Sequence, residues 1–339
     1  MADRFSPEGV RIAIVGATGL LGEALLEQLA SSGFPVASIA ALASTESKGE
    51  TVLFAGKAIA VQVVDGFDFS QCQLAFFVAT PTVSEQHARR AAEQGCYVVD
   101  ATGYFSADAD VPLIMPGIGI VAGDTASRIF ASPGSVAAIA ARLLYPLMAT
   151  TELESVQING ILSVADAGRK AVSELAGQTA RLLNGQPADA SVFEQQIAFN
   201  IVPQPEATGG SGFSRQELQL MVELPRLLGV DNLLVQSKLL WASVFYGHRV
   251  DIDVQMVQPI EASAVSAAIA SVPGNAFNAT SSLTPMVQHD ADAVLSFGSP
   301  RLHPRSPRWL HLCAVSDSLR GSGSQNLVHI AEFLLKSYF

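Results

Sequence analysis

The stretch Arg11-Ile-Ala-Ile-Val15, Gly16-Ala-Thr-Gly19-Leu-Leu-Gly22, Glu23-Ala-Leu-Leu-Glu-Gln-Leu29 decides the fold class of this chain. A short apolar run, typical of a buried strand, leads into a turn with three glycines, and a run of helix-forming residues follows. Glycines let backbone N–H groups approach a pyrophosphate, and the positive end of the helix dipole adds to the attraction. The order of strand, glycine turn and helix therefore predicts a dinucleotide-binding βαβ unit.

The same rhythm continues along the first third of the chain. Short, nearly all-apolar runs predict strands of a parallel sheet that is covered on both faces, at residues 11–15, 38–44, 74–79 and 96–100. Helical segments alternate with them at residues 20–31 and 83–94. Thr82 or Ser84 is the expected cap of the second helix. This alternation predicts a doubly wound, Rossmann-type domain over residues 1–131.

The pattern changes after Pro133. An apolar segment at residues 135–149 predicts a long helix, and the period-two alternation at 154–164 and 249–257 predicts antiparallel strands with one face exposed. We expect a mixed α/β dimerisation or substrate domain over residues 132–316, whose flat β face is a plausible dimer surface. Within the C-terminal segment, residues 317–339, a helix is expected to return to the first domain.

Composition excludes several classes of function. The 339 residues are 49% hydrophobic and carry a net charge of −11, which argues against a nucleic-acid or anionic-membrane partner. No apolar run is long enough to span a bilayer, and the N-terminal residues do not resemble a signal peptide. Three unpatterned cysteines, Cys72, Cys96 and Cys313, indicate a reducing compartment and structural thiols. The expected location is therefore the cytoplasm, and no metal site is predicted.

Several collinear motifs then point to one family. They are Gly16-Ala-Thr-Gly-Leu-Leu-Gly22, Asp110-Val-Pro-Leu-Ile-Met-Pro116, Ile197-Ala-Phe-Asn-Ile-Val-Pro203, Gly247-His248, and Asp317-x-Leu-Arg320 followed by Asn326-x-Val-x-Ile-Ala-Glu332. In this order they resemble the aspartate-semialdehyde dehydrogenase family. The resemblance implies a Rossmann domain, a dimerisation domain and a homodimer. It also implies a reaction in which a cysteine thiolate attacks an aldehyde, a histidine acts as acid and base, and hydride passes to NADP. Phosphate then displaces the thioester.

The catalytic motifs depart from that pattern. Ser135 stands in the position of the family's cysteine, and a serine hydroxyl is a far weaker nucleophile unless a strong base adjoins it. A serine that only caps a helix is the simpler reading of Ser135. His248 occupies the position of the catalytic histidine, although a structural strand-end histidine is the alternative. Glu217 is retained too, and it could equally lie on a solvated first helical turn.

At four further positions this chain lacks the residue types that the resemblance implies for binding and orienting the substrate and phosphate. The resemblance places the family's orienting glutamine at Leu162, its substrate-binding arginine at Trp241, its phosphate-binding arginine at Ser106 and its phosphate-side lysine at Gln219. Tryptophan cannot replace the bidentate contact of arginine with a carboxylate.

The cofactor loop is intact. The residues expected to hold a dinucleotide are Gly16, Thr18, Gly19, Leu20, Leu21, Gly22, Ser44 and Glu46. A glycine turn kept only for packing is the alternative. Family members carry an arginine where Glu46 stands, and that arginine favours the 2′-phosphate of NADP. A glutamate repels this phosphate but accepts hydrogen bonds from a ribose hydroxyl, so NAD is favoured over NADP.

The sequence therefore predicts a dimeric, dinucleotide-binding homologue of aspartate-semialdehyde dehydrogenase without that activity. Two alternatives stay open. One is an active NAD(P)-dependent oxidoreductase that acts through His248 on another aldehyde, or that keeps residual semialdehyde dehydrogenase activity. The other is a non-enzymatic partner protein. The altered pocket leaves room for a different small-molecule ligand.

Overall fold

A computed structural model describes residues 9–122, 127–207, 209–279, 283–286 and 293–338. Internal contacts divide the chain into two compact units. The first comprises Met1–Gly134 together with Gly323–Phe339, and the second comprises Ser135–Ser322. The divisions expected from the sequence, after residues 131 and 316, fall a few residues before these.

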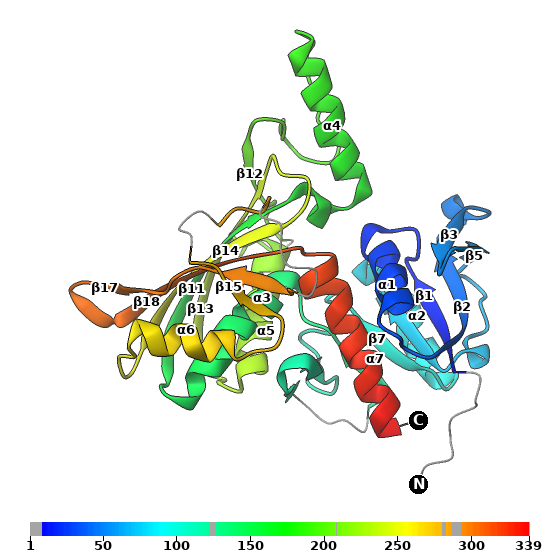
Figure 1. The fold of residues 1–339 in the computed structure, drawn as a ribbon. Coiled ribbons are helices and arrows are strands. Elements are labelled where there is room, and N and C mark those ends of the chain that lie inside the picture. Colours follow the sequence, from blue (N-terminus) through cyan, green and yellow to red (C-terminus); the bar gives the residue numbers. More distant parts are fainter. Residues whose placement is uncertain (1–8, 123–126, 208, 280–282, 287–292, 339) are drawn as a thin grey trace. The chain divides into compact units, whose positions relative to one another are not determined.

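The first unit is built on an eight-stranded sheet with β1 near its centre (Figure 1). Its strands, in spatial order, are β5 (Gln62–Val63), β2 (Val36–Ala43), β1 (Val10–Val15), β6 (Leu74–Phe77), β7 (Tyr97–Asp100), β10 (Ile129–Ala131), β8 (Leu113–Met115) and β9 (Ile120–Ala122). Every pairing is parallel except that of β8 with β9. Because β2 and β6 lie on opposite sides of β1, the winding reverses there, and ligands of such sheets bind at this switch point. The hairpin β3 (Thr51–Phe54) and β4 (Lys57–Ala60) forms a separate two-stranded sheet.

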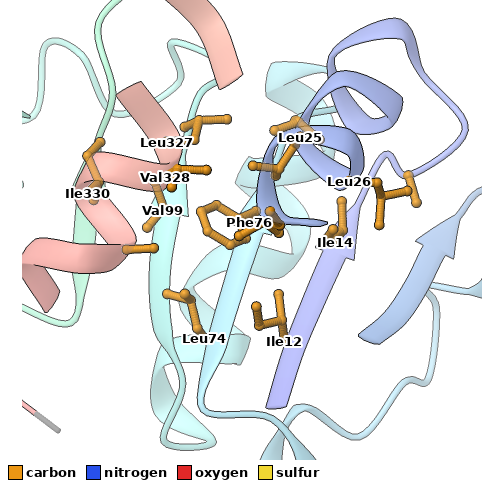
Figure 2. Close-up of a cluster of buried hydrophobic side chains, with 14 of the residues drawn as sticks. Ile12, Ile14, Leu25, Leu26, Leu74, Phe76, Val99, Leu327, Val328 and Ile330 are labelled. Atoms are coloured by element: carbon orange, nitrogen blue, oxygen red, sulfur yellow. The ribbon is translucent and has the colours of Figure 1, made fainter. Parts of the chain in front are cut away.

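Helices α1 (Leu20–Ser31) and α7 (Gln325–Tyr338) pack against this sheet in one hydrophobic core (Figure 2). Leu25 of α1, Leu327 of α7 and Phe76 of β6 are completely buried in it. Fully burying such a side chain stabilises the fold by about 1.5–3 kcal/mol. The expected return of the C-terminal helix to the first domain is thereby confirmed.

Helix α2 (Pro81–Glu93) begins differently from the prediction. Its N-cap is Thr80, which makes no side-chain capping bond, and neither Thr82 nor Ser84 caps it. Pro81 explains the difference, because the fixed φ of proline and its missing N–H suit the first position of a helix. Ser84 is buried inside the helix, where its hydroxyl donates a 2.6 Å hydrogen bond to Asp100.

The second unit contains a mixed sheet whose main path runs β12 (Ile201–Pro203), β13 (Leu234–Ala242), β11 (Leu153–Leu162), β14 (His248–Met256), β18 (Ser306–Ser316), β16 (Leu295–Phe297) and β15 (Asn275–Phe277). Strand β17 (Arg301–His303) pairs with β18 beside this path. The expected strands at 154–164 and 249–257 are present and antiparallel to each other. However, β11 also pairs in parallel with β13, because α4 (Arg169–Leu183) and α5 (Arg215–Leu228) lie between them in the chain and allow a crossover.

Helices α3 (Ser135–Leu144), α5 and α6 (Ala262–Ala270) lie along one side of this sheet, whereas α4 extends away from it (Figure 1). The expected helix at 135–149 ends at Leu144 and continues as a 3₁₀ turn, because Pro146 has no N–H for another α-helical bond. Helix α3 packs closely on the sheet. A Cβ on Gly160 of β11 would clash with Leu239 of β13 and would touch Val136 of α3.

The other face of the sheet carries partly exposed polar side chains. Arg249 donates two hydrogen bonds, of 2.8 and 2.7 Å, to Asp251, and Nδ1 of His311 lies 2.9 Å from Oδ1 of Asp253. Trp309 on β18, paired with Gln255 of β14, belongs to the same face and is 36% exposed. We refer to these six residues as the open face.

Within the described ranges, no helix is long and apolar enough to cross a membrane. Over the same residues, no group of three or more histidine, cysteine or acidic side chains could hold a metal ion. His289, one of the six histidines of the chain, falls outside the described residues.

Candidate functional site

The glycine loop lies at the switch point of the first sheet. Gly16 follows β1 with a φ of +98°, and a Cβ added to it would come within 2.8 Å of the backbone nitrogen of Ala79, just after β6. A Cβ on Gly22 would overlap the carbonyl oxygen of Gly16. Both positions therefore require glycine, the first for its conformation and the second for close approach of helix and loop.

The start of α1 leaves backbone donors available for an anion. Gly19 is the N-cap and makes no side-chain capping bond, and Leu20, Leu21 and Gly22 form the first turn. The N–H groups of a first helical turn have no acceptor within the helix, and the helix dipole makes this end positive. Loop and helix thus fit the pyrophosphate of a dinucleotide.

A short 3₁₀ turn, Thr45–Ser47, follows β2 beside this loop. The hydroxyls of Ser47 and Thr18 lie 3.5 Å apart, which brings the two segments together. Ser44 is the N-cap of the turn, and Glu46 is exposed within it. The structure therefore places all eight residues predicted for the cofactor in two adjoining segments of the first unit.

The predicted catalytic residues belong to the second unit. Ser135 is the first residue of α3 and is half-buried, one position inside the helix rather than at its N-cap. Leu162 ends β11 and is buried in the core. Gln219 on α5 donates a 2.7 Å hydrogen bond to the buried carboxylate of Glu223. Ser106, by contrast, lies buried in the first unit.

His248 is completely buried at the start of β14. Its Nδ1 accepts a hydrogen bond from the backbone N–H of Ser163 at 3.2 Å. In the neutral ring the proton must therefore sit on Nε2, because a backbone N–H can only donate. Nε2 faces Oδ1 of Asp166 at 3.5 Å, a distance at which the interaction is mainly electrostatic. Both ring nitrogens are thus turned toward groups of the protein itself.

Asp166 is the centre of this arrangement, and the sequence did not identify it. It lies in the 3₁₀ turn Val164–Ala167, and its Oδ2 accepts hydrogen bonds from Gln216 at 2.8 Å and from the indole N–H of Trp241 at 3.4 Å. Burial alone would raise the pKa of Asp166. The neighbouring His248 ring, with the hydrogen bonds from Gln216 and Trp241, outweighs burial and lowers the pKa below its ordinary value.

Trp241 and Gln216, which both donate hydrogen bonds to Asp166, are held in place by further residues. The ring of Trp241 packs edge-on against Phe193 at 5.1 Å, within an apolar cluster that also contains Leu175 of α4. The side-chain oxygen of Gln216 accepts a hydrogen bond from Gln204. We refer to Asp166, Gln216, Trp241 and His248 as the Asp166 cluster.

Glu217 has a different set of contacts. One of its oxygens accepts the backbone N–H of Ser214 at 2.7 Å and completes a capping box at the start of α5. The other accepts the backbone N–H of Leu239 on β13 at 2.9 Å. Both carboxylate oxygens of Glu217 therefore hold the backbone, and the carboxylate is not on a solvated turn.

Neither cysteine of the first unit can take the place of the missing nucleophile. Cys72 and Cys96 are buried, and burial raises the pKa of Cys96 to about 12. The thiol of Cys96 donates to the carbonyl oxygens of Phe69 and Cys72. A buried thiol of this kind is inert at neutral pH.

The fold and these sites define a two-unit protein of the semialdehyde dehydrogenase class. The family model "Semialdehyde dehydrogenase, NAD binding domain" matches residues 11–120, and "Semialdehyde dehydrogenase, dimerisation domain" matches residues 144–321. The chain is 35% identical over 332 residues to the aspartate-semialdehyde dehydrogenase of Shewanella violacea, covering 97% of this chain and 98% of that protein.

Two further relatives agree. The USG-1 protein homolog of Pseudomonas aeruginosa is 35% identical over 333 residues, which is 97% of this chain and 98% of that one. A crystal structure of aspartate semialdehyde dehydrogenase II from Vibrio cholerae, complexed with ASA, superposes with a TM-score of 0.91. It is 32% identical and covers 98% of this chain and 99% of that one. The chain belongs to the aspartate-semialdehyde dehydrogenase family, with its NAD-binding and dimerisation domains.

Proposed function

We propose that this protein is a homodimeric, dinucleotide-binding member of its family that does not catalyse the phosphorylating oxidation of a semialdehyde. The observation that carries the proposal is the state of His248. A histidine whose Nδ1 accepts a backbone N–H and whose Nε2–H faces a buried carboxylate has no nitrogen directed at a substrate. Ser135 offers a hydroxyl in the nucleophile position, and a hydroxyl is a weak nucleophile without a strong base beside it.

The charge of the altered residues supports the same conclusion. In the second unit, Trp241 and Gln219 occupy positions where the family resemblance places cations, and Asp166 adds an ionised carboxylate next to Trp241. An anionic substrate or phosphate would meet repulsion where the family offers attraction. An oxidoreductase that uses His248 on an uncharged aldehyde is disfavoured too, because the ring is completely buried.

The glycine loop supports retained binding of a dinucleotide. Gly16 and Gly22 keep the close approaches that a Cβ would block, and the first turn of α1 offers its backbone N–H groups. A bound NAD or NADP would supply a hydride acceptor, but in this protein it would serve as a ligand. Glu46 beside the loop favours NAD, because its carboxylate repels a 2′-phosphate.

The absence of activity is tested by turnover. Aspartate semialdehyde, phosphate and either NAD or NADP are supplied, and reduced cofactor is followed by absorbance. We expect no rate above a blank without protein, for the unmodified chain and for Ser135→Ala alike. The Shewanella violacea relative serves as the positive control. A phosphate-dependent rate that Ser135→Ala abolishes would overturn the proposal.

Binding is tested separately with a matched pair of variants at Gly19. Aspartate and asparagine are both good N-cap residues, so both variants should keep α1 stable, but only Gly19→Asp would place a negative charge beside the pyrophosphate. We expect NAD to bind the unmodified chain and Gly19→Asn in calorimetric titrations, and Gly19→Asp to bind at least tenfold more weakly. Equal affinities for the two variants would contradict a dinucleotide in this loop.

A further inference from the structure

The Asp166 cluster joins residues from four separate segments of the second unit. Asp166 lies in the segment that follows β11, Gln216 in the first turn of α5, Trp241 near the end of β13 and His248 at the start of β14. Asp166 and Trp241 are 75 residues apart, yet the indole N–H of Trp241 is directed at the carboxylate. The two residues are therefore parts of one hydrogen-bonded arrangement.

A chain of hydrogen bonds leads into the cluster and ends at Asp166, with each donor pointing toward that carboxylate. The hydroxyl of Ser214 donates to Gln204, the amide of Gln204 donates to Gln216, and the amide of Gln216 donates to Asp166. The carboxylate is the common acceptor, because Gln216 and Trp241 both direct N–H groups at it, and Nε2 of His248 faces it at 3.5 Å. Such a carboxylate has no proton of its own to give and stays ionised.

Asp166 is the group that faces Nε2 of His248. The His248 side chain has no exposed surface, whereas the Asp166 side chain, 3.5 Å from Nε2, is 12% exposed. On its other side the ring is held by Ser163, which adjoins β11. Removing the Asp166 side chain therefore takes away the group that faces Nε2 while leaving the Nδ1 contact in place.

An arginine in place of Trp241 would be incompatible with this carboxylate. The indole nitrogen of Trp241 already lies 3.4 Å from Oδ2 of Asp166, so a guanidinium there would pair with Asp166. In a buried setting such a pair is hard to separate, because one partner would be left as an uncompensated charge. Asp166 and Trp241 thus suit one another, and neither suits the binding of an external carboxylate.

We propose that Asp166 is a positioning residue that clamps His248, its carboxylate facing Nε2 at 3.5 Å, so that the histidine is withheld from any ligand. The clamp rests on the proposed function, because it explains how a retained histidine can be silent. It adds a second barrier that is independent of the missing thiol.

Diethyl pyrocarbonate tests the clamp, because it acylates only accessible, unprotonated imidazole nitrogens. The folded protein is modified at pH 7 and is then digested. Mass spectrometry of the peptides gives the extent of modification at each histidine. Exposed His303 is the internal reference, and His311 on β18 reports that the sheet has stayed folded. In the unmodified chain we expect His248 to react at least tenfold more slowly than His303.

Two variants of Asp166 separate positioning from packing. Asp166→Gly removes the clamp, and we expect the rate at His248 to rise at least tenfold with His303 and His311 unchanged. Asp166→Asn keeps the shape and an acceptor oxygen, and we expect a rate within threefold of the unmodified chain. An unreactive His248 in Asp166→Gly, or equal reactivity of the two variants, would overturn the clamp and leave the proposed inactivity intact. Turnover by the unmodified chain would overturn the proposed function without altering these rates.

Discussion

The carboxylate of Glu217 accepts the backbone N–H of Leu239 at 2.9 Å and thereby ties the first turn of α5 to the middle of β13. Its second oxygen closes the capping box with Ser214. A residue in the family's active-site pattern is thus fully occupied with backbone donors. Glu217 thereby secures the first turn of α5. The residue just before it, Gln216, belongs to the Asp166 cluster.

Glu217→Ala is expected to destabilise the protein. Losing half of a capping box costs about 1 kcal/mol, and the unsatisfied N–H of Leu239 adds about 1–3 kcal/mol. Urea unfolding should therefore show a loss of about 2 kcal/mol or more. Exposed Asp231, just after α5, provides the control, and Asp231→Ala should change stability by less than about 0.5 kcal/mol. Equal stability of the two variants would show that the Glu217 contacts contribute nothing.

Asp100→Asn is expected to alter how stability depends on pH. Burial raises the pKa of Asp100 above its ordinary value, despite the hydrogen bonds from Ser84 and Thr102. The folded state therefore holds the proton more tightly than the unfolded state, and above about pH 3.9 stability falls as pH rises toward the folded pKa. Asparagine cannot ionise and escapes this loss.

The measurement is urea unfolding of both proteins between pH 4 and 7. The stability of Asp100→Asn relative to the unmodified chain should grow as pH rises across this window. Asp68→Asn, an exposed carboxylate whose pKa is lowered, should show no such gain. A relative stability that stays flat or declines for Asp100→Asn would contradict the prediction.

Glu46→Arg is expected to reverse the cofactor preference. The side chain lies in the exposed turn beside Thr18, where a guanidinium can bind a 2′-phosphate and a carboxylate repels it. Calorimetric titration should show NAD binding more tightly than NADP to the unmodified chain, and at least tenfold tighter NADP binding by the variant. Glu50→Arg adds the same charge to an exposed position nearby and serves as the control. Tighter NADP than NAD binding by the unmodified chain would refute the assigned preference.

Trp309→Asp is expected to weaken the homodimer. Trp309 is 36% exposed on the open face, and a carboxylate there would be desolvated if a second copy covers it. Sedimentation velocity should show at least a tenfold rise in the dimer dissociation constant. Leu183→Asp makes the same change at a 74% exposed residue of α4 and should leave the dimer intact. Dissociation caused only by Leu183→Asp would place the interface elsewhere.

Local patterns predicted more of this protein than long-range ones. The loop from Gly16 to Gly22 could be recognised because its strand, turn and helix are consecutive, and the structure bears out the expected βαβ arrangement. Period-two alternation located β11 and β14 but could not give strand direction, so the parallel pairing of β11 with β13 was missed. The sequence pattern places the cap of α2 at Thr82 or Ser84, whereas Pro81 fixes the first helical turn and makes Thr80 the N-cap.

Asp166 was missed for a different reason. Its partners Gln216 and Trp241 lie 50 and 75 residues away, and no spacing rule connects them. The aspartate stands just before Ala167-Gly168, and only the structure shows what its carboxylate contacts. Residues that act together at a site but lie far apart in the sequence are therefore found by their contacts rather than by their motifs.

Restoring the family residues is expected to revive chemistry only when Asp166 is also removed. A variant carrying Ser135→Cys, Leu162→Gln, Trp241→Arg, Gln219→Lys and Ser106→Arg regains the thiol, the orienting glutamine and the three cations that the family resemblance implies. With Asp166 in place, however, the guanidinium introduced by Trp241→Arg would pair with the carboxylate and His248 would stay covered. Adding Asp166→Gly frees both, so phosphate-dependent cofactor reduction should appear at a rate at least tenfold higher than in the five-residue variant. Comparable rates with and without Asp166 would show that the thiol and the anion ligands alone decide activity.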